Sequence, residues 1–438
     1  MEYYKTILTD NNNIEYNYYP KYNLLLPKEI DLSNSSYSEK IAFFLSKLQP
    51  KTVSDNRLKE GIRRRIGSVR KIVLELSQDC NLKCRYCVYS GRFISERKHS
   101  KKYMNIKMAK LSIDYFLNWI EKNKRINYNP EFFTVGYYGG EPLKNYEVLK
   151  ESLIYARKRF SNERGNSAIL NFDMTTNGLL LDKEKIDFLA SNNVRIVISL
   201  DGPLEIQNKN RGKGTYEILF DKLLYIYENY PEYYKKHVDY SIVYVPDTDM
   251  KQIREYFSKE IFESCSRLNL GHVKTIYSSL KYPENGKNEK EVTIEIREKM
   301  NHGEKLTKIE QQIWKYHFGF GLNSLTIRDK GGYGAFCILG EKSIYITVDG
   351  EFQACEKIGQ GFGIGSLVKG FNFKRIEELE RERIRLTQKC KNCLIQSICV
   401  ACTAFVGFNG KIVLEEYCKQ AISDFKRRVS DYLEYQKS

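Results

Sequence analysis

Short apolar runs alternate with amphipathic stretches along the middle of the chain. The strand-sized runs cover 71–76, 132–138, 169–175, 194–200, 238–245 and 270–277. Between them lie predicted helices over MAKLSIDYFLNWIEKN, EVLKESLIYARKRF and KEKIDFLASNN; in the first, Ala109, Ile113 and Phe116 share one face. Repeated β–α units with apolar strands predict a parallel sheet, either open or curled into a partial barrel.

The two ends of the chain show other patterns. Residues 1–70 read as short aromatic strands followed by helical stretches over SEKIAFFLSKL and VSDNRLKEGIRRR, which predicts a small α+β module. The alternating part is assigned to 71–300, and 301–336 is interpreted as a linker with a helix over KIEQQIWKYHF. Residues 337–420 hold short strands, turns and seven cysteines, and 421–438 lie in a closing helix.

The composition is that of a globular protein, with 42% hydrophobic and 29% charged residues among 438. The N-terminal MEYYKTILTDNNN contains no secretory signal, and no apolar run approaches the roughly eighteen residues that span a bilayer. We therefore expect a cytoplasmic protein without a membrane partner. The net charge of +16 is spread along the chain, so we expect no nucleic-acid partner. The basic residues either form a solvated surface or attract an acidic partner, such as an acidic peptide segment.

Eleven cysteines are distributed unevenly. Cys80, Cys84 and Cys87 lie within eight residues, Cys265 stands alone, and the other seven lie between 337 and 418. Clustered thiols in a reducing compartment usually bind metal rather than form disulfides. The C-x3-C-x2-C loop directly follows the strand at 71–76, and active residues lie at the carboxyl ends of such strands.

Three thiolates at this spacing can hold three irons of a cubane cluster and leave the fourth iron open to a small molecule. A zinc site completed by Cys265, or three packed cysteines, are the alternatives. At the end of the second strand, YYGGEP contains Gly139, Gly140 and Glu141. The glycines let a ligand approach the backbone, and the carboxylate can accept hydrogen bonds from an ammonium group; an ordinary turn is the alternative.

With these motifs the chain resembles the radical SAM superfamily, in which CxxxCxxC follows the first strand of a partial TIM barrel. The resemblance implies an α/β fold with a partial (βα)6 TIM barrel, a 4Fe–4S cluster, and S-adenosyl-L-methionine bound to the open iron. In that family, one electron cleaves the sulfonium to methionine and a 5′-deoxyadenosyl radical, which abstracts a hydrogen atom.

The same resemblance implies the residues that bind the cofactor. Tyr86 packs beside the adenine, the GGE motif holds the methionine amine, Ser199 faces the ribose, and Arg211 pairs with the methionine carboxylate. A strand-end cap for Ser199 and a surface position for Arg211 are the alternatives. TTNG and SLDGP resemble the family's next strand ends. The complete cofactor-binding set is Tyr86, Gly139, Gly140, Glu141, Asn177, Ser199, Asp201 and Arg211.

The C-terminal cysteines form a second pattern, in which the two CxxC pairs of CKNCLIQSICVAC could alone form a zinc knuckle. The whole series resembles the SPASM extension of radical SAM peptide-modifying enzymes, which carries two auxiliary 4Fe–4S clusters and so implies three clusters in all. The implied ligands are Cys390, Cys393, Cys399 and Cys418 for one, and Cys337, Cys355 and Cys402 for the other. Two residues separate Cys399 and Cys402, where that family usually has three; this leaves open which cysteine binds which cluster but does not change the resemblance to SPASM.

The cluster of Cys337, Cys355 and Cys402 is then one cysteine short. A substrate thiolate or Cys265 could complete it, although a lone buried cysteine is often a small apolar residue. Glu356, directly after Cys355, is the candidate catalytic residue that deprotonates the substrate; a surface glutamate is the alternative.

The leading hypothesis is a radical SAM enzyme that modifies a ribosomally synthesised precursor peptide, most simply by a thioether crosslink; carbon–carbon crosslinks and epimerisation stay open. The expected partners are a precursor peptide with a leader sequence and a reductant such as flavodoxin or ferredoxin. Residues 1–70 would hold the leader as a winged-helix-like module, by strand addition. The alternatives are an anaerobic sulfatase-maturating enzyme that makes formylglycine, and a non-enzymatic zinc or iron–sulfur protein.

Overall fold

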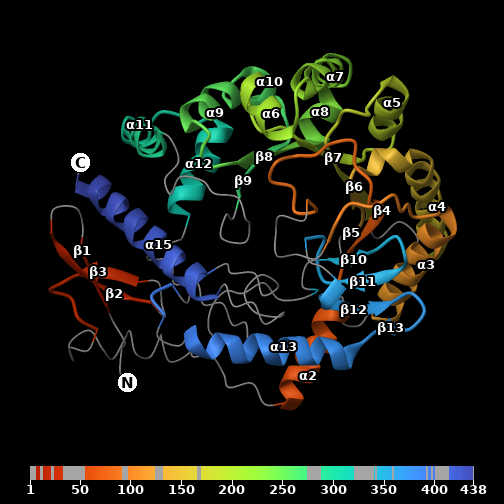
Figure 1. Cartoon of the computed structure of the whole chain (residues 1–438), viewed down its shortest axis with the longest axis horizontal. Helices are drawn as coiled ribbons and strands as arrows, with labels where there is room; N and C mark the ends of the chain where they lie inside the picture. The colour runs from red at the N-terminus through yellow and green to blue at the C-terminus, as the bar shows by residue number, and fades with distance from the viewer. Residues whose placement is uncertain are drawn as a thin grey trace.

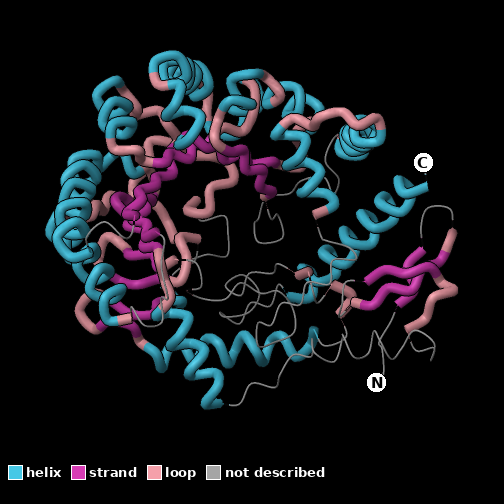
Figure 2. Tube along the Cα trace, turned by 180° about the vertical axis from the view of Figure 1, so that it is seen from behind, coloured by secondary structure: helices cyan, strands magenta, loops and turns pink. Residues whose placement is uncertain are grey.

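The structure is a computed structural model of the whole chain. It describes residues 6–9, 13–20, 24–32, 55–90, 97–123, 132–164, 169–273, 288–319, 340, 343–357, 360–390, 393–395, 398–399 and 414–437. Within these residues the fold is mixed α/β. One large curved sheet carries most of the helices on its outer side, and a small sheet lies apart from it beside the C-terminal helix (Figures 1 and 2).

Six parallel strands, β4 to β9, follow one another across the large sheet in sequence order. Their bounds are β4 Lys71–Ser77, β5 Phe132–Gly139, β6 Ile169–Thr176, β7 Arg195–Ser199, β8 Val238–Tyr244 and β9 Arg267–His272. The prediction of strands is confirmed for the first five. The sixth strand was predicted over 270–277 but begins three residues earlier, at Arg267, where Leu268 is buried between the exposed Arg267 and Asn269. Residues 274–277 of that prediction lie outside the described residues.

Helices connect these strands along the outer side of the sheet (Figure 1). Their bounds are α3 Ile106–Lys122, η1 Pro142–Asn145, α4 Tyr146–Arg164, α5 Lys183–Ser191, α6 Leu204–Arg211, α7 Thr215–Asn229, α8 Pro231–His237, α9 Met250–Phe257 and α10 Glu260–Ser264. The three helices predicted from apolar spacing correspond to α3, α4 and α5. Asn105 and Asp182 cap α3 and α5, because their side chains accept backbone N–H groups of the first turn.

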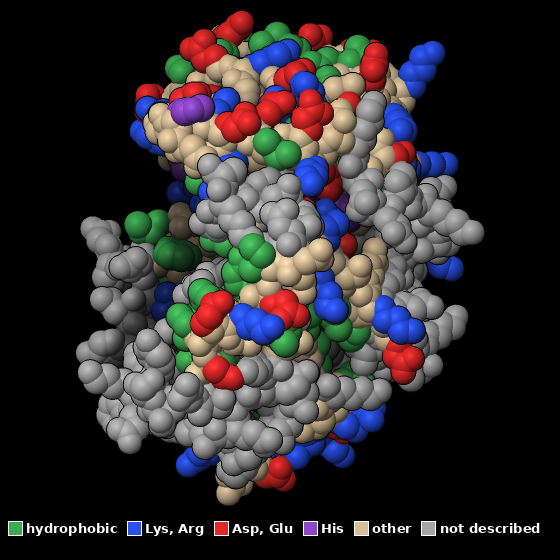
Figure 3. Space-filling view, turned by 90° about the vertical axis from the view of Figure 1, so that its left-hand side faces the viewer, with side chains coloured by type: hydrophobic (Ala, Val, Ile, Leu, Met, Phe, Trp, Pro, Cys, Tyr) green, Lys and Arg blue, Asp and Glu red, His purple; other side chains and the backbone are tan. Residues whose placement is uncertain are grey.

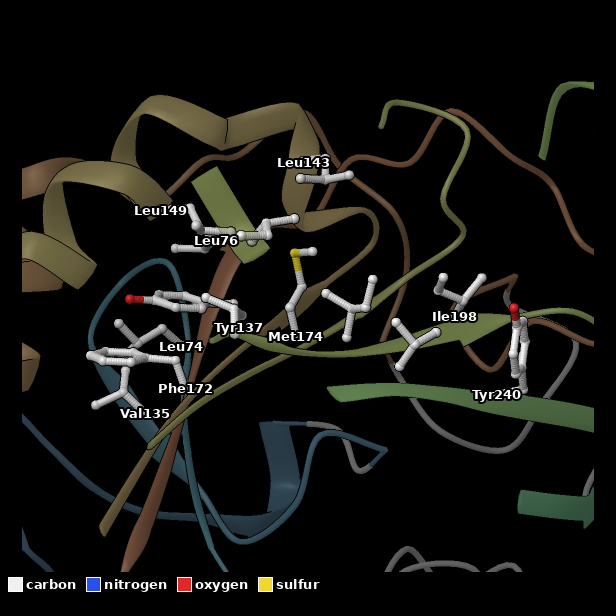
Figure 4. Packing of buried hydrophobic residues seen from close by; sticks show 14 of the residues in the cluster. Leu74, Leu76, Val135, Tyr137, Leu143, Leu149, Phe172, Met174, Ile198 and Tyr240 are labelled. Carbon is white, nitrogen blue, oxygen red and sulfur yellow. The ribbon is translucent and has the colours of Figure 1, made fainter. Parts of the chain in front are cut away.

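The main core lies between the parallel strands and these helices. Figure 4 shows Leu74, Val135 and Phe172 from three neighbouring strands gathered together, and Leu149 of α4 beside Leu76 in the same cluster. The rings of Tyr137 and Phe172 stack with centroids 6.5 Å apart. Each side chain buried in this way contributes about 1.5–3 kcal/mol to folding. The core therefore holds the strands rigidly, and their carboxyl ends form a fixed edge for the loops.

The C-terminal half extends the same sheet beyond β4. Strand β10 pairs parallel with β4, and β11, β12 and β13 then continue antiparallel. The bounds are β10 Ile344–Ile346, β11 Glu351–Gln353, η4 Gln360–Phe362, β12 Gly363–Ser366 and β13 Gly370–Phe371. The first strand of the radical SAM-like part therefore lies directly beside the segment that carries Cys355.

Two helices precede these strands, α11 Glu289–Asn301 and α12 Lys308–Phe318. The helix predicted over KIEQQIWKYHF is confirmed by α12, which packs against β9 and α9. The polar composition around 281–291 gave no sign of α11. That helix forms because Val292 and Ile296, four residues apart, are both buried on one face.

The small sheet consists of β1 Thr6–Thr9, β2 Glu15–Tyr19 and β3 Leu24–Pro27, all antiparallel. One face packs against α15, which spans Leu414–Lys437; the rings of Tyr18 and Phe425 lie 5.2 Å apart. The helix predicted over SEKIAFFLSKL lies outside the described residues.

Helix α2, Asp55–Gly67, also belongs to the predicted 1–70 module, but its Ile62 and Ile66 join the main core. It packs against α13, Phe373–Thr387, which is followed by η5, Gln388–Cys390. The buried Glu380 of α13 pairs with Arg65 of α2 at 3.2 Å. Helix α2 is thus held by the main body.

Acidic and basic side chains are intermixed on the face shown in Figure 3. Among the helices of the described residues, none combines the length and the apolar character needed to cross a membrane.

Candidate active site

Cys80, Cys84 and Cys87 lie in the loop that follows β4, at the carboxyl edge of the sheet. The thiols are partly buried and close enough to influence one another electrostatically. Burial raises the pKa of Cys80 to about 12, with smaller contributions from Glu141, Cys84 and Cys87. A metal centre relieves such a penalty, because it binds the thiolate and supplies the compensating positive charge.

The two glycines of YYGGEP lie directly against this loop. A Cβ atom on Gly139 would stand 2.0 Å from the carbonyl oxygen of Ser77, and one on Gly140 would stand 2.3 Å from that of Asp79. The backbone N–H of Gly140 donates to Ser77 O at 2.7 Å, and that of Glu141 donates to Asp79 O at 2.9 Å. What approaches the glycines so closely is the cysteine loop itself, and only glycine leaves room for it.

Glu141 is fully buried, and its carboxylate joins two strand ends. It accepts hydrogen bonds from Thr176 Oγ1 at 2.7 Å and from the backbone N–H groups of Asn177 and Leu143 at 2.8 and 3.1 Å. Burial raises its pKa to about 7, although these three hydrogen bonds act in the opposite direction. Both carboxylate oxygens therefore have protein partners.

Asn177, in TTNG, reaches back to the cysteine loop. Its side-chain amide donates to Asn81 Oδ1 at 2.8 Å and lies 3.8 Å from the sulfur of Cys80. The backbone N–H of Leu82 also points to that sulfur, at 3.4 Å. Polar N–H groups directed at a sulfur favour its thiolate form.

The residues expected to bind the nucleoside and the methionine carboxylate form one buried group. Tyr86 donates to Asp201 Oδ2 at 2.5 Å, and Arg211 pairs with Asp201 Oδ1 at 2.9 Å. The guanidinium lies 5.5 Å from the centre of the Tyr86 ring. Burial acts to lower the pKa of Arg211, but Asp201, Tyr86 and Cys84 together outweigh it, so the pKa is raised. Ser199, half-buried, ends β7 nearby.

Part of this group has unused hydrogen-bonding capacity. Among the described residues, Nε of Arg211 and both side-chain amide atoms of Asn210 are buried without a partner. Asn210 is tied to the cysteine loop, because its carbonyl accepts the N–H of Arg85 at 2.9 Å. Unsatisfied buried polar atoms are rare and often indicate a missing ligand. Three thiols and these atoms fit an iron–sulfur cluster with a polar, charged cofactor beside it.

The described residues contain no group of three His, Cys, Asp or Glu side chains placed like the ligands of one metal ion. A cubane cluster needs a wider arrangement, because each thiolate binds its own iron atom.

Four C-terminal cysteines from separate segments come together. Burial, with smaller contributions from the neighbouring thiols Cys393, Cys399 and Cys418, raises the pKa of Cys390 to about 12. Cys418 lies in α15, while the other three precede it by nineteen or more residues. The same region packs on the small N-terminal sheet, so Cys393 and Cys399 lie against its apolar face.

Cys355 and Glu356 follow β11. The thiol of Cys355 donates to Glu356 Oε2 at 3.3 Å, and burial raises its pKa, with Glu356 adding to the effect. The expected co-ligands Cys337 and Cys402 lie outside the described residues.

Cys265 has a different environment. It is 1% exposed and belongs to the core between β8 and the outer helices, with Tyr240 and Phe262. Burial raises its pKa to about 12, and the charges that modify this pKa are those of Lys308, Asp239 and Glu263. Cys265 thus packs as a small apolar residue in the core.

Sequence reasoning missed several residues of this region. Glu75, in the middle of the apolar KIVLEL, pairs with Arg97, and both lie beside Tyr89 and Tyr345. An acidic residue inside a buried strand was the available signal. The sequence around Asn210 gave no signal that could have identified this residue.

Comparison with known proteins agrees with this geometry. Residues 74–259 match the family model described as "Radical SAM superfamily". Residues 74–259 are therefore a radical SAM domain.

Two curated relatives are informative. The radical SAM cyclopropyl synthase TigE of Paramaledivibacter caminithermalis is 24% identical over 226 residues, which cover 50% of this chain and 42% of TigE. A cysteine-type anaerobic sulfatase-maturating enzyme of Clostridium perfringens is 28% identical over 206 residues, which cover 45% of this chain and 50% of that enzyme. The chain thus spans about half the length of the curated relatives it matches.

Among solved structures, one described as "Native anSMEcpe with bound AdoMet" has a TM-score of 0.57 and 20% identity. The match covers 84% of this chain and 98% of that chain. The same enzyme with bound AdoMet and Cp18Cys peptide gives a TM-score of 0.56 at 19% identity. At this identity the likeness shows a shared fold.

Proposed function

We propose that this protein is a radical SAM enzyme that modifies a ribosomally synthesised precursor peptide. The observation that carries the proposal is the convergence of Cys390, Cys393, Cys399 and Cys418 beside a radical SAM domain. This combination resembles the SPASM extension of peptide-modifying enzymes. The peptide-bound neighbour and the sulfatase-maturating relatives add support.

We infer that β4–β9 form the partial barrel of that fold, with 337–420 as its SPASM extension. Cys80, Cys84 and Cys87 would hold the cluster that binds S-adenosylmethionine. That cluster would supply one electron, taken from flavodoxin or ferredoxin, to cleave the sulfonium of the cofactor. Cys390, Cys393, Cys399 and Cys418 would hold one auxiliary cluster, and Cys337, Cys355 and Cys402 the other.

The protein's own groups would bind and orient the cofactor. Tyr86 and Arg211 are fixed by Asp201, and the unpartnered Nε of Arg211 is placed to meet a carboxylate. Glu141 would act mainly by holding the ends of β5 and β6, since its oxygens already have partners. The amine would then meet backbone groups of Gly139 and Gly140.

A thioether crosslink balances with S-adenosylmethionine as the oxidant. A peptide carbon would lose a hydrogen atom to the 5′-deoxyadenosyl radical, giving 5′-deoxyadenosine, and a cysteine thiol would lose its proton as the carbon–sulfur bond forms. The one electron released in that step would pass to the iron–sulfur clusters that the protein's cysteines would hold. Glu356 is the candidate acceptor of that proton, because its carboxylate lies 3.3 Å from the thiol of Cys355, where the substrate thiolate would approach. The leader would add to an edge of the β1–β3 sheet.

Iron and sulfide content after anaerobic reconstitution tests the proposal. Three clusters give about twelve irons per chain. Reduced protein should then convert S-adenosylmethionine to 5′-deoxyadenosine. A content of about four irons with bound zinc would remove the auxiliary clusters from the account.

Formylglycine formation on a sulfatase is the second candidate, favoured by the sulfatase-maturating relatives. Mass spectrometry of the product separates the two. A thioether removes two hydrogen atoms from the peptide, whereas formylglycine formation turns the thiol-bearing carbon of cysteine into an aldehyde carbon with loss of the sulfur. Two substrates are to be compared: a cysteine-containing sulfatase segment, and any short cysteine-rich peptide that is encoded beside the gene.

A further inference from the structure

A buried ion pair connects the cysteine loop after β4 with the segment that carries Cys355. Glu75 lies on β4 and is 2% exposed; it pairs with Arg97, whose side chain is 10% exposed. The Glu75 carboxylate also accepts hydrogen bonds from the cysteine loop and from the turn after β10. Gln78 Nε2 donates to it at 2.9 Å, and the backbone N–H of Val348 donates at 3.1 Å. One carboxylate thus joins β4, its loop and the turn after β10.

Arg97 lies between two aromatic rings. Its guanidinium carbon is 4.9 Å from the centre of the Tyr89 ring and 4.5 Å from that of Tyr345. Tyr345 also donates to Glu75 Oε1 at 3.0 Å and accepts from Arg97 at 3.0 Å. A guanidinium stacked in this way is well fixed, because cation–π attraction strengthens when water is excluded.

Two donors from this group meet at one carbonyl oxygen. Arg97 donates to Glu356 O at 2.7 Å, and Tyr89 donates to the same oxygen at 2.5 Å. Tyr89 follows Cys87 by two residues, and Glu356 follows Cys355 directly. The radical SAM cysteine loop and the segment of Cys355 are therefore joined through a single peptide group.

We propose that Glu75, Arg97, Tyr89 and Tyr345 form a clamp that sets the position of Cys355 relative to the radical SAM cysteines. Arg97 and Tyr89 are positioning residues, since they act through the carbonyl of Glu356 rather than on substrate. That the clamp positions an auxiliary cluster rests on the proposed function. That the clamp positions the thiol of Cys355 is independent of the proposed function.

The physical basis is the difference in how the two cysteine groups are supported. The Cys80 side is also held by backbone hydrogen bonds to Gly140 and Glu141 and by Asn177. On the Cys355 side, the side-chain hydrogen bonds that reach the Glu356 carbonyl come from the clamp. Loss of a clamp donor therefore loosens Cys355 first.

The test compares thiol reactivity in the metal-free, full-length protein. Tyr89→Phe and Arg97→Lys each weaken one donor and keep the size of the side chain. Tyr155→Phe and Arg159→Lys are matched controls, because both residues bind Asp114 on the outer helices, at 2.8 and 2.9 Å. Alkylation by iodoacetamide is followed cysteine by cysteine with mass spectrometry.

We expect alkylation of Cys355 to become at least tenfold faster in both clamp variants, while Cys390 changes less than twofold. The controls should leave both rates unchanged. Equal acceleration of alkylation at Cys355 and Cys390 would mean a general loss of stability. No acceleration at Cys355 would mean that the clamp does not hold Cys355. Either result overturns the proposal. Tyr89→Phe, the milder change, decides the matter if Arg97→Lys does not fold.

The reconstituted protein gives the second readout. In the clamp variants, about four of about twelve irons should pass to a chelator at least tenfold faster than in the controls. If the unaltered protein holds only about four irons, the proposed auxiliary clusters fail, while the alkylation result still decides the clamp. If it holds about twelve and the variants release iron at the control rate, the clamp does not position that cluster.

Discussion

The carboxylate of Glu141 accepts the backbone N–H of Asn177 at 2.8 Å and so fastens the end of β5 to the end of β6. Asn177 in turn donates to Asn81 of the cysteine loop. A single buried acid therefore organises three loops at the carboxyl edge of the sheet.

Replacing Glu141 with alanine should destabilise the protein. Three donors, from Leu143, Thr176 and Asn177, would lose their acceptor inside the core. Buried unsatisfied groups cost about 1–3 kcal/mol each, so we expect a loss of at least about 2 kcal/mol in the free energy of unfolding. Urea denaturation of the metal-free protein measures it. Glu184→Ala is the control, because its side chain is 74% exposed; a loss equal to the control would contradict a structural role for Glu141.

Replacing Cys84 with alanine should remove one cluster and leave the others. Iron should fall from about twelve to about eight per chain, and cleavage of S-adenosylmethionine should stop. Cys265→Ala is the matched control, since Cys265 is buried in the core with Tyr240 and Phe262. Its iron content should stay at the level of the unaltered protein. Loss of iron in the Cys265 variant would show that this thiol is a ligand after all.

His317 should make the protein less stable in mild acid. It is 4% exposed, and burial, with help from Arg428, Arg427 and His272, lowers its pKa from 6.5 to about 3. Between these values the unfolded chain binds a proton that the folded protein does not, so stability falls as pH falls below about 6.5. From pH 7 to pH 5 this amounts to roughly 2 kcal/mol.

The His317→Phe variant isolates that contribution. Phenylalanine keeps an aromatic ring beside Tyr316 and Phe318 but cannot be protonated. Urea denaturation at pH 7 and at pH 5 should show a smaller loss of stability for the variant, because all other titrating groups are shared. An identical loss in both proteins would mean that His317 has the same pKa in the folded protein as in the unfolded chain.

Replacing Phe425 with alanine should release the small N-terminal sheet. Phe425 is 4% exposed and packs on Tyr18, and truncation of a buried phenylalanine costs about 3–5 kcal/mol. The cost should appear as local opening, because among the described residues the apolar face of that sheet packs on α15 and on residues 393–395 and 398–399 and belongs to a cluster separate from the main core. Limited proteolysis should cut within 1–32 at least tenfold faster, and Phe425→Leu should restore most of the protection. Unchanged cleavage would mean that other contacts hold the sheet.

Local sequence determined the parallel strands and several of the helices that the structure describes. Apolar positions repeat every three or four residues in α3, α4 and α5, and that spacing was sufficient to predict them. The cysteine loop and YYGGEP were placed at one edge because the direction of parallel strands fixes which ends meet. The polar surface of α11 concealed a buried stripe of only a few residues, and so this helix was missed.

Tertiary structure alone decided the partners of the charged and polar groups. Glu75 meets Tyr345 across 270 positions of the chain, and no local pattern encodes such a contact. The glycines of YYGGEP are needed because the cysteine loop lies on them, and Cys265 is buried with outer-helix residues. Periodicity reports which face of an element is buried, whereas the atoms that meet there depend on how distant segments pack together.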